Sequence, residues 1–119
     1  MNAVLVALAG AAGALARYGI GAAVGTRTFP WATLGINVAG SLMLGFVLAG
    51  PGTRWSATAT TAVAVGFLGA FTTFSTFAHE GTALLRDDRP GAALAYVALS
   101  MGLGLAAAAL GYVAGRATA

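Results

Sequence analysis

The 119-residue sequence contains no cysteine and no lysine, and it has only three acidic residues and one histidine. The absence of cysteine excludes disulfides, thiol chemistry and cysteine-bound zinc. The six basic residues are single, scattered arginines, so the net charge of +3 does not form the basic stripe that is typical of a nucleic-acid-binding protein. We therefore expect no nucleic-acid partner.

Charge of either sign is scarce, at 8% of residues, whereas hydrophobic residues make up 59%. Soluble domains contain about 25% charged residues, so this composition indicates an integral membrane protein surrounded by lipid. The first apolar run has no basic residue before Arg17. A secretory signal peptide would begin with a basic region, so we interpret this run as the first membrane span. The Ala- and Gly-rich, lysine-free composition suggests a bacterium, and hence a multi-pass protein of the bacterial plasma (inner) membrane.

Turn signals divide the chain into four apolar segments. The separators are Phe29-Pro30-Trp31, Gly50-Pro51-Gly52 and the polar stretch 86–91. We predict an all-α fold with one domain over residues 1–119 and four transmembrane helices, at about 2–25, 31–49, 55–85 and 92–115. The third segment is longer than the roughly 20 residues that cross a bilayer, which indicates an interruption. Among the small residues, the pairs Gly21/Gly25 and Gly111/Gly115 have the spacing that lets helices approach closely.

Residues 66–77 place four aromatic rings, four hydroxyl groups and two glycines inside an uncharged run that extends from Arg54 to Glu80. Hydroxyl groups and glycines weaken a helix, so this stretch is unlike a plain membrane anchor. A broken helix at membrane depth is tolerated where it is buried in protein or lines a cavity. Such breaks often direct backbone carbonyls and helix ends toward an ion. We therefore expect the interruption of the third helix here.

Two polar stripes run along other segments. Asn37 has Thr33 one turn before it and Ser41 one turn after it, and Tyr96 is followed one turn later by Ser100. Such side chains often serve as hydrogen-bonding glue between helices, worth about 1 kcal/mol each. Alternatively, because buried polar groups in a bilayer tend to be functional, the two stripes line one pathway. Both interpretations remain open from the sequence.

Acidic residues are absent from the first, second and fourth segments. A proton-coupled exporter, such as the four-helix small multidrug transporters, needs a titratable carboxylate at mid-membrane. What the chain offers instead are hydroxyl groups, an amide, aromatic ring edges with partial positive charge and Arg17. This inventory suits a small anion. Arg17 either snorkels to the interface or makes a vestibule electropositive.

Three motifs in this order resemble the Fluc fluoride channels, also called CrcB proteins, over essentially the whole chain. The first runs from Gly10 to Tyr18, although Ala9 stands where many members have a second glycine. The second runs from Phe29 to Ser41. The third and most specific is Gly66-Phe-Leu-Gly-Ala-Phe-Thr-Thr-Phe-Ser-Thr-Phe77, and Tyr96 and Ser100 match the family's polar pair in the fourth helix.

The resemblance implies a fluoride-selective channel, not an enzyme, that exports cytoplasmic fluoride by passive electrodiffusion and gives fluoride resistance. It implies a homodimer with its subunits in opposite orientations. Phe74 and Phe77 would present ring edges to the ion, and Arg17 and Glu80 would lie toward the vestibule. Carbonyls of Gly69 and Thr72 would hold a structural sodium ion at the dimer centre. Hydrogen bonds along the pathway would come from Asn37, Ser75, Thr76, Tyr96 and Ser100, with Thr33 on the same stripe.

The charge distribution agrees with two orientations in one membrane. Four crossings place both termini and the loop around Arg54 on one side, with Arg116 as its other arginine, while the opposite side carries Arg27, Arg86 and Arg89. Loops richer in Arg and Lys stay cytoplasmic, and a difference of two against three specifies orientation weakly. The alternatives to a channel are a small proton-coupled multidrug-type transporter and a membrane scaffold that transports nothing.

Overall fold

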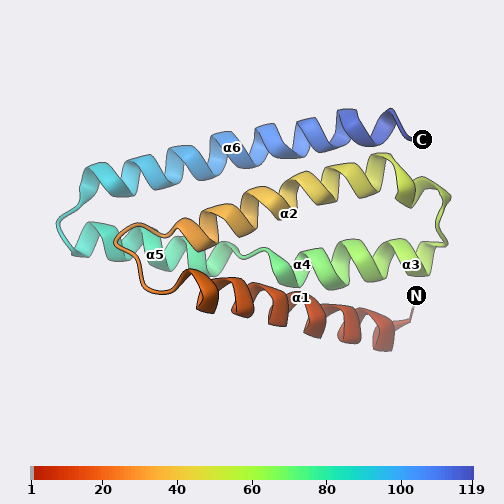
Figure 1. The fold of residues 1–119 in the computed structure, drawn as a ribbon, viewed down its shortest axis with the longest axis horizontal. Coiled ribbons are helices and arrows are strands. Elements are labelled where there is room, and N and C mark those ends of the chain that lie inside the picture. The colour runs from red at the N-terminus through yellow and green to blue at the C-terminus, as the bar shows by residue number, and fades with distance from the viewer. Residues whose placement is uncertain (1) are drawn as a thin grey trace.

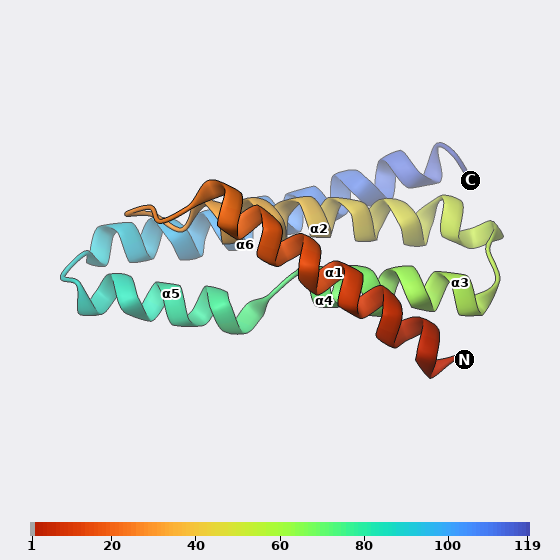
Figure 2. The same cartoon turned by 60° about the horizontal axis from the view of Figure 1, so that its bottom comes forward.

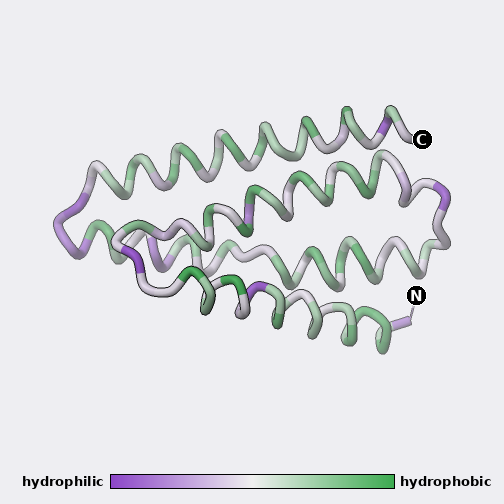
Figure 3. The backbone as a smooth tube through the Cα atoms, in the orientation of Figure 1, coloured by the Kyte–Doolittle hydropathy of each residue, from purple (hydrophilic) through white to green (hydrophobic). Residues whose placement is uncertain are grey.

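The computed structural model describes residues 2–119, and its helices run roughly along one axis (Figure 1). Within these residues, four stretches are long and apolar enough to cross a membrane: Ala3–Val24, Trp31–Arg54, Ala57–Arg86 and Pro90–Arg116. The bundle measures 49 × 30 × 21 Å, so it is longer than the roughly 30 Å hydrocarbon core of a bilayer. Hydrophilic stretches gather at its two ends (Figure 3). The prediction of an all-helical protein with four spans is confirmed.

The first turn between spans is tightly specified by backbone conformation. α1 (Ala3–Val24) ends at Gly25, whose φ of 73° lies in the left-handed region that glycine adopts without strain. Segment 25–30 then leads into α2 (Trp31–Ala49). The short 3₁₀ turn η1 (Pro51–Arg54) lies at the opposite end of the bundle, beside both ends of the chain (Figure 1).

α6 (Pro90–Arg116) packs along α2 over most of its length. The contact is backbone against backbone: a Cβ added to Gly111 would lie 2.1 Å from the Leu42 carbonyl oxygen, and one added to Gly115 would lie 2.5 Å from that of Phe46. Real Cβ atoms do not approach so closely, so only glycine fits at these two positions. The close approach predicted for the Gly111/Gly115 pair is therefore present.

α1 crosses the third span obliquely (Figure 2). At the crossing, a Cβ on Gly13 would lie 2.2 Å from the Phe67 carbonyl oxygen. The Gly21/Gly25 pair behaves differently from the pair in α6. A Cβ added to either residue would meet nothing within 4 Å, so this pair forms no helix contact within the chain, and Gly25 serves instead to end α1.

The third span changes its helical type along its length. A π-helical turn follows its first piece, and two residues in extended conformation, Thr72 and Thr73, separate its last two pieces. The pieces are α3 (Ala57–Thr61), η2 (Ala62–Leu68, the π-helix), α4 (Gly69–Phe71) and α5 (Phe74–Arg86). π-helical turns often occur at functional sites, and here the π-helix leads directly into the extended residues.

Candidate functional site

Thr72 and Thr73 are the centre of the candidate site. Their backbones are extended, with φ/ψ of −82°/159° and −151°/121°, so the helix cannot continue through them. The Thr73 hydroxyl then caps α5 by accepting the backbone N–H of Thr76 at 3.2 Å, which is the usual role of threonine at an N-cap. Backbone groups that a continuous helix would pair internally are therefore available near the middle of the bundle.

Asn37 of α2 holds this extended pair in place. Its amide nitrogen donates to the Thr73 carbonyl at 3.0 Å, and its amide oxygen accepts the Thr73 N–H at 2.8 Å. Because a backbone N–H can only donate and a carbonyl can only accept, these partners fix which way the carboxamide points. Asn37 is thus a two-point clamp between α2 and the extended pair. One amide N–H remains after the clamp is made.

Arg17 holds the opposite side of the same region. Its Nε donates to the Ala70 carbonyl at 3.1 Å, at the end of α4, and the side chain is half-buried. A cation at the carbonyl end of a helical turn is electrostatically favourable. Arg17 therefore contacts the end of α4.

The carbonyls of Gly69 and Thr72 lose the partners that a continuous helix would supply. The N–H that would bond to the Gly69 carbonyl belongs to Thr73, which donates to Asn37 instead. The N–H that would bond to the Thr72 carbonyl belongs to Thr76, which donates to the Thr73 hydroxyl. Hard cations prefer such oxygen ligands, so the two carbonyls have the right chemistry for the sodium ion predicted from the sequence.

A groove of about 290 Å³ opens beside the extended pair. Within residues 2–119, all the side chains that line it are uncharged. They include Asn37, Phe74, Phe77 and Ser100 from three different helices, and Gly69 and Thr72 also lie on its wall. The Ser100 Oγ is buried and has no hydrogen-bond partner within the described chain. A buried hydroxyl without a partner is costly, so this groove presents a donor that a ligand can use.

The outer side of this groove is open in a single chain. Phe74 is 77% exposed, and Ser75 is also exposed, with its hydroxyl 3.4 Å from that of Thr73. Thr76 is half-buried. Of the predicted site residues of α5, Phe74 and Phe77 therefore line the groove, whereas Ser75 and Thr76 do not.

An aromatic column leads from this groove toward one end of the bundle. The ring centroids of Phe74 and Phe77 lie 5.7 Å apart, and Phe77 lies 5.1 Å from Tyr96 of α6. Tyr96 is fully buried and lies 5.5 Å from Phe29 in an edge-to-face arrangement, with an interplanar angle of 82°. These spacings are within the range of favourable aromatic pairs.

The polar end of Tyr96 faces Glu80. The Tyr96 hydroxyl donates to Glu80 Oε1 at 3.3 Å, and buried Thr33 lies beside the same hydroxyl. Tyr96 thereby joins the two polar stripes that the sequence suggested, because Thr33 belongs to α2 and Tyr96 to α6. Glu80 supplies the charge at this end of the column.

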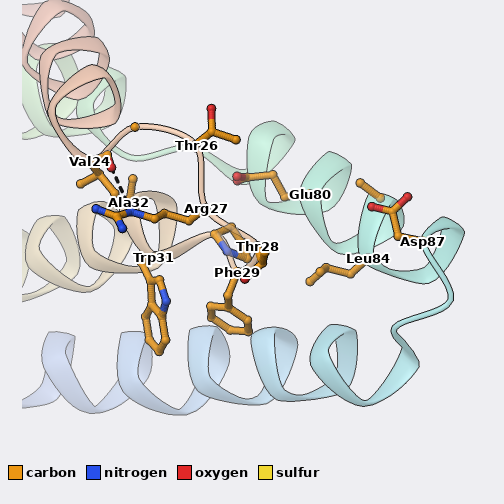
Figure 4. A pocket seen from close by; sticks show the side chains of 13 residues that line it. Val24, Thr26, Arg27, Thr28, Phe29, Trp31, Ala32, Glu80, Leu84 and Asp87 are labelled. Atoms are coloured by element: carbon orange, nitrogen blue, oxygen red, sulfur yellow. Dashed lines mark hydrogen bonds between the residues drawn. The ribbon is translucent and has the colours of Figure 1, made fainter.

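Glu80 also lines a second cavity, of about 290 Å³, at the end of the bundle (Figure 4). We call it the mouth pocket. Segment 25–30 forms one wall and α5 the other, with Asp87 further out. The arginine that shares this pocket with Glu80 is Arg27, whose Nε donates to the Val24 carbonyl at 3.0 Å. Arg17 does not line this pocket, and its place toward the vestibule stays a prediction.

Sequence reasoning missed Phe29, Arg27 and Thr73. Phe29 was visible as an aromatic in a turn, which is common at membrane interfaces, and no local pattern pairs it with Tyr96. Thr73 is one of several adjacent hydroxyl residues, and only its contact with Asn37 distinguishes it.

Comparison with known proteins gives consistent similarities over nearly the full chain. A family model described as CrcB-like protein, Camphor Resistance (CrcB), matches residues 4–112. The chain is 48% identical to fluoride-specific ion channel FluC 1 of Symbiobacterium thermophilum, over 97% of this chain and 98% of that protein. It is 46% identical to a FluC of Thermus thermophilus (95% and 94% covered) and 47% identical to FluC of Deinococcus radiodurans (92% and 91% covered).

Proposed function

Because the chain belongs to the CrcB-like protein family, we propose that it is a fluoride-selective channel that lets cytoplasmic fluoride leave the cell down its electrochemical gradient. Its similar relatives are named fluoride-specific ion channels and come from bacteria. With four apolar spans, it is a multi-pass protein of a bacterial membrane. The function is the passage of an ion, with no bond made or broken.

The observation that carries this proposal is the uncharged groove beside Thr72 and Thr73. Fluoride is small and strongly hydrated, so burying it without replacement ligands is very costly. The groove offers a buried hydroxyl without a partner on Ser100 and the rings of Phe74 and Phe77. Hydroxyl protons and the positive edges of aromatic rings both favour an anion. None of these groups is a full positive charge, so the ion can leave again, as conduction requires.

Passive conduction is also favoured by the position of the acids. The carboxylates of Glu80 and Asp87 line the mouth pocket, outside the central groove. A proton-coupled transporter needs its titratable group where the substrate binds. Fluoride is the base of a weak acid, so the neutral acid enters from acidic surroundings and ionises inside. An inside-negative membrane potential then drives the anion out through a channel without any coupling.

A second copy of the chain in the opposite orientation would complete the pathway. The support is the open side of the groove, where Phe74 is 77% exposed although its partner Phe77 is packed against Tyr96. The weak arginine bias between the two sides agrees with dual orientation.

Labelling of a single cysteine tests this arrangement. Because the chain has no cysteine, a Thr53→Cys substitution reports on which side of the membrane residue 53 of each molecule lies. Labelling from both faces of the membrane supports the antiparallel homodimer, and labelling from one face only refutes it.

A structural sodium ion is the further part of this proposal. The carbonyls of Gly69 and Thr72 would hold it, since the N–H groups that would otherwise pair with them donate to Asn37 and to the Thr73 hydroxyl. The ion would supply positive charge that ties the carbonyls of two subunits together. Replacing sodium by a bulky organic cation should lower the melting temperature of the purified protein. A melting temperature that is independent of sodium would contradict this site.

Efflux from liposomes tests the channel proposal. Vesicles loaded with fluoride and containing the purified protein should release it only when an ionophore balances the charge, at a rate that a pH gradient does not change. Release that depends on the pH gradient would support the coupled transporter instead. If the vesicles release no more fluoride than protein-free vesicles, the protein does not transport fluoride, and the scaffold interpretation is favoured.

A further inference from the structure

The aromatic column has an outer member, Phe29, that connects it to the mouth pocket. Phe29 lines that pocket, while Phe77 lines the central groove. Tyr96 lies between the two rings, is fully buried and contacts both. The lining of the mouth pocket and the lining of the central groove therefore meet where these three rings pack together. At that place, the only charged partner of Tyr96 within the described chain is Glu80.

Segment 25–30 carries Phe29 and is held by two hydrogen bonds at Arg27 and Thr28. The Arg27 side chain donates to the Val24 carbonyl, which ties the start of the segment to the end of α1. The guanidinium of Arg89, from the loop before α6, donates to the Thr28 carbonyl next to Phe29. Figure 4 shows the Phe29 side chain extending from this segment toward α6. Arg27 from within the segment and Arg89 from the loop before α6 thus restrain a segment that has no secondary structure of its own.

We propose that segment 25–30 is a strap that holds the Phe29 ring against Tyr96, and that Phe29 is a positioning residue for the Tyr96 hydroxyl at the junction of the mouth pocket and the central groove. The inference rests on the proposed fluoride conduction. The edge-to-face contact stops the Tyr96 ring from rotating away from Glu80. The hydrogen bond from Arg89 to the Thr28 carbonyl keeps segment 25–30 packed against the bundle. With the ring held, the Tyr96 hydroxyl keeps its single donor on Glu80, and the tightly packed junction excludes anions larger than fluoride.

Two other roles are possible for these residues: Phe29 could only fill the core, and Arg89 could act only through its charge. Each role predicts a different result from the strap. If Phe29 only fills the core, its loss lowers stability but leaves ion selectivity unchanged. If Arg89 acts only by its charge at the mouth, then removing any neighbouring arginine has the same effect. Arg86 is the matched control for charge, because it lies in the last turn of α5 near the same loop and does not line the mouth pocket. Trp55, an interfacial aromatic at the opposite end of the bundle that is 41% exposed, is the matched control for loss of a ring.

The experiment measures fluoride and chloride efflux from liposomes for the wild type and for single variants of the full chain. The strap variants are Phe29→Leu, Phe29→Tyr and Arg89→Met, and the controls are Arg86→Met and Trp55→Leu. Loss of one aromatic pair corresponds to roughly a two- to tenfold effect. We expect Phe29→Leu and Arg89→Met each to lower the ratio of fluoride to chloride efflux by about this factor, with Phe29→Tyr close to the wild type because it keeps the ring. A double variant that combines Phe29→Leu with Arg89→Met should match Phe29→Leu alone, since both changes act through one contact.

Each outcome decides the question. Wild-type vesicles that release no fluoride refute the proposed function itself. If the wild type conducts but Phe29→Leu and Arg89→Met keep the wild-type ratio, the strap inference is wrong. It is also wrong if Arg86→Met lowers the ratio as much as Arg89→Met, or if the effects of the double variant multiply. If Phe29→Leu fails to fold, Arg89→Met still tests the hydrogen bond to the Thr28 carbonyl, and Phe29→Tyr still tests whether an aromatic ring at position 29 is sufficient.

Discussion

Replacing Asn37 by alanine should destabilise the protein more than a typical polar substitution in a membrane helix. Hydrogen bonds between membrane helices are worth about 1 kcal/mol on average. Asn37, however, satisfies both backbone groups of Thr73, through contacts of 3.0 and 2.8 Å, and these groups stay inside the bundle after the substitution. Each backbone group left without a partner costs about 1–3 kcal/mol. Because the region is part-buried, we expect a total loss of about 2–4 kcal/mol.

Asn37→Asp keeps one of the two hydrogen bonds between residue 37 and Thr73 and removes the other. The carboxylate still accepts the Thr73 N–H but sets an oxygen against the Thr73 carbonyl, where the amide now donates at 3.0 Å. It also adds a negative charge to the lining of the groove. We expect a loss of stability at least as large as that of the alanine variant, because the carboxylate repels the Thr73 carbonyl and is an unpaired charge in a part-buried site, and a larger loss of fluoride efflux because the charge repels the anion.

The assay is reversible unfolding of the purified protein in detergent, with fluoride efflux measured in parallel. Ser41→Ala is the matched control, since the Ser41 hydroxyl lies on the same face of α2 and, among residues 2–119, bonds only to the Asn37 carbonyl at 2.7 Å. That carbonyl belongs to the helix ladder, so the control should cost less than about 1 kcal/mol. If Asn37→Ala is no less stable than Ser41→Ala, Asn37 is not a clamp and its contact with Thr73 contributes nothing to the fold.

Three further predictions concern the groove and the helix crossing. Phe74→Ile and Phe77→Ile should each cut fluoride efflux by at least about tenfold with the fold intact by size-exclusion chromatography, because isoleucine keeps bulk but has no positive ring edge; normal efflux in both would make the rings packing residues only. Ser100→Ala should leave stability unchanged or raise it by about 1 kcal/mol, since the hydroxyl has no partner within the described chain, while efflux falls several-fold; a loss of stability would contradict this. Gly13→Ala should cost more than about 2 kcal/mol, because its Cβ would lie 2.2 Å from a carbonyl oxygen of η2, whereas Gly21→Ala, with open space around it, should cost little in the same unfolding assay.

The residues of α5 and the groove show how far the sequence alone could lead. Ser100 was predicted from its place on a polar stripe one turn after Tyr96, and Phe74 and Phe77 were predicted from the resemblance of residues 66–77 to the Fluc family. Thr73 and Phe29 could not be found in this way. Thr73 gains its role from Asn37, 36 positions earlier in the chain, and Phe29 gains its contact with Tyr96 only when segment 25–30 folds against α6.

What the sequence by itself determined is the part set by local physics. A span without charges must enter the bilayer, glycine and proline clusters must end helices, and a stretch rich in hydroxyl groups weakens its helix, so four spans follow from residue order alone. The tertiary structure decided which backbone groups lose their partners and which side chains satisfy them. Arg17 is the clearest case: its charge and position in the first span were evident, but its bond to the Ala70 carbonyl depends on how α1 crosses α4. A hydrogen bond between distant segments requires a particular packing of helices, and no local pattern specifies that packing.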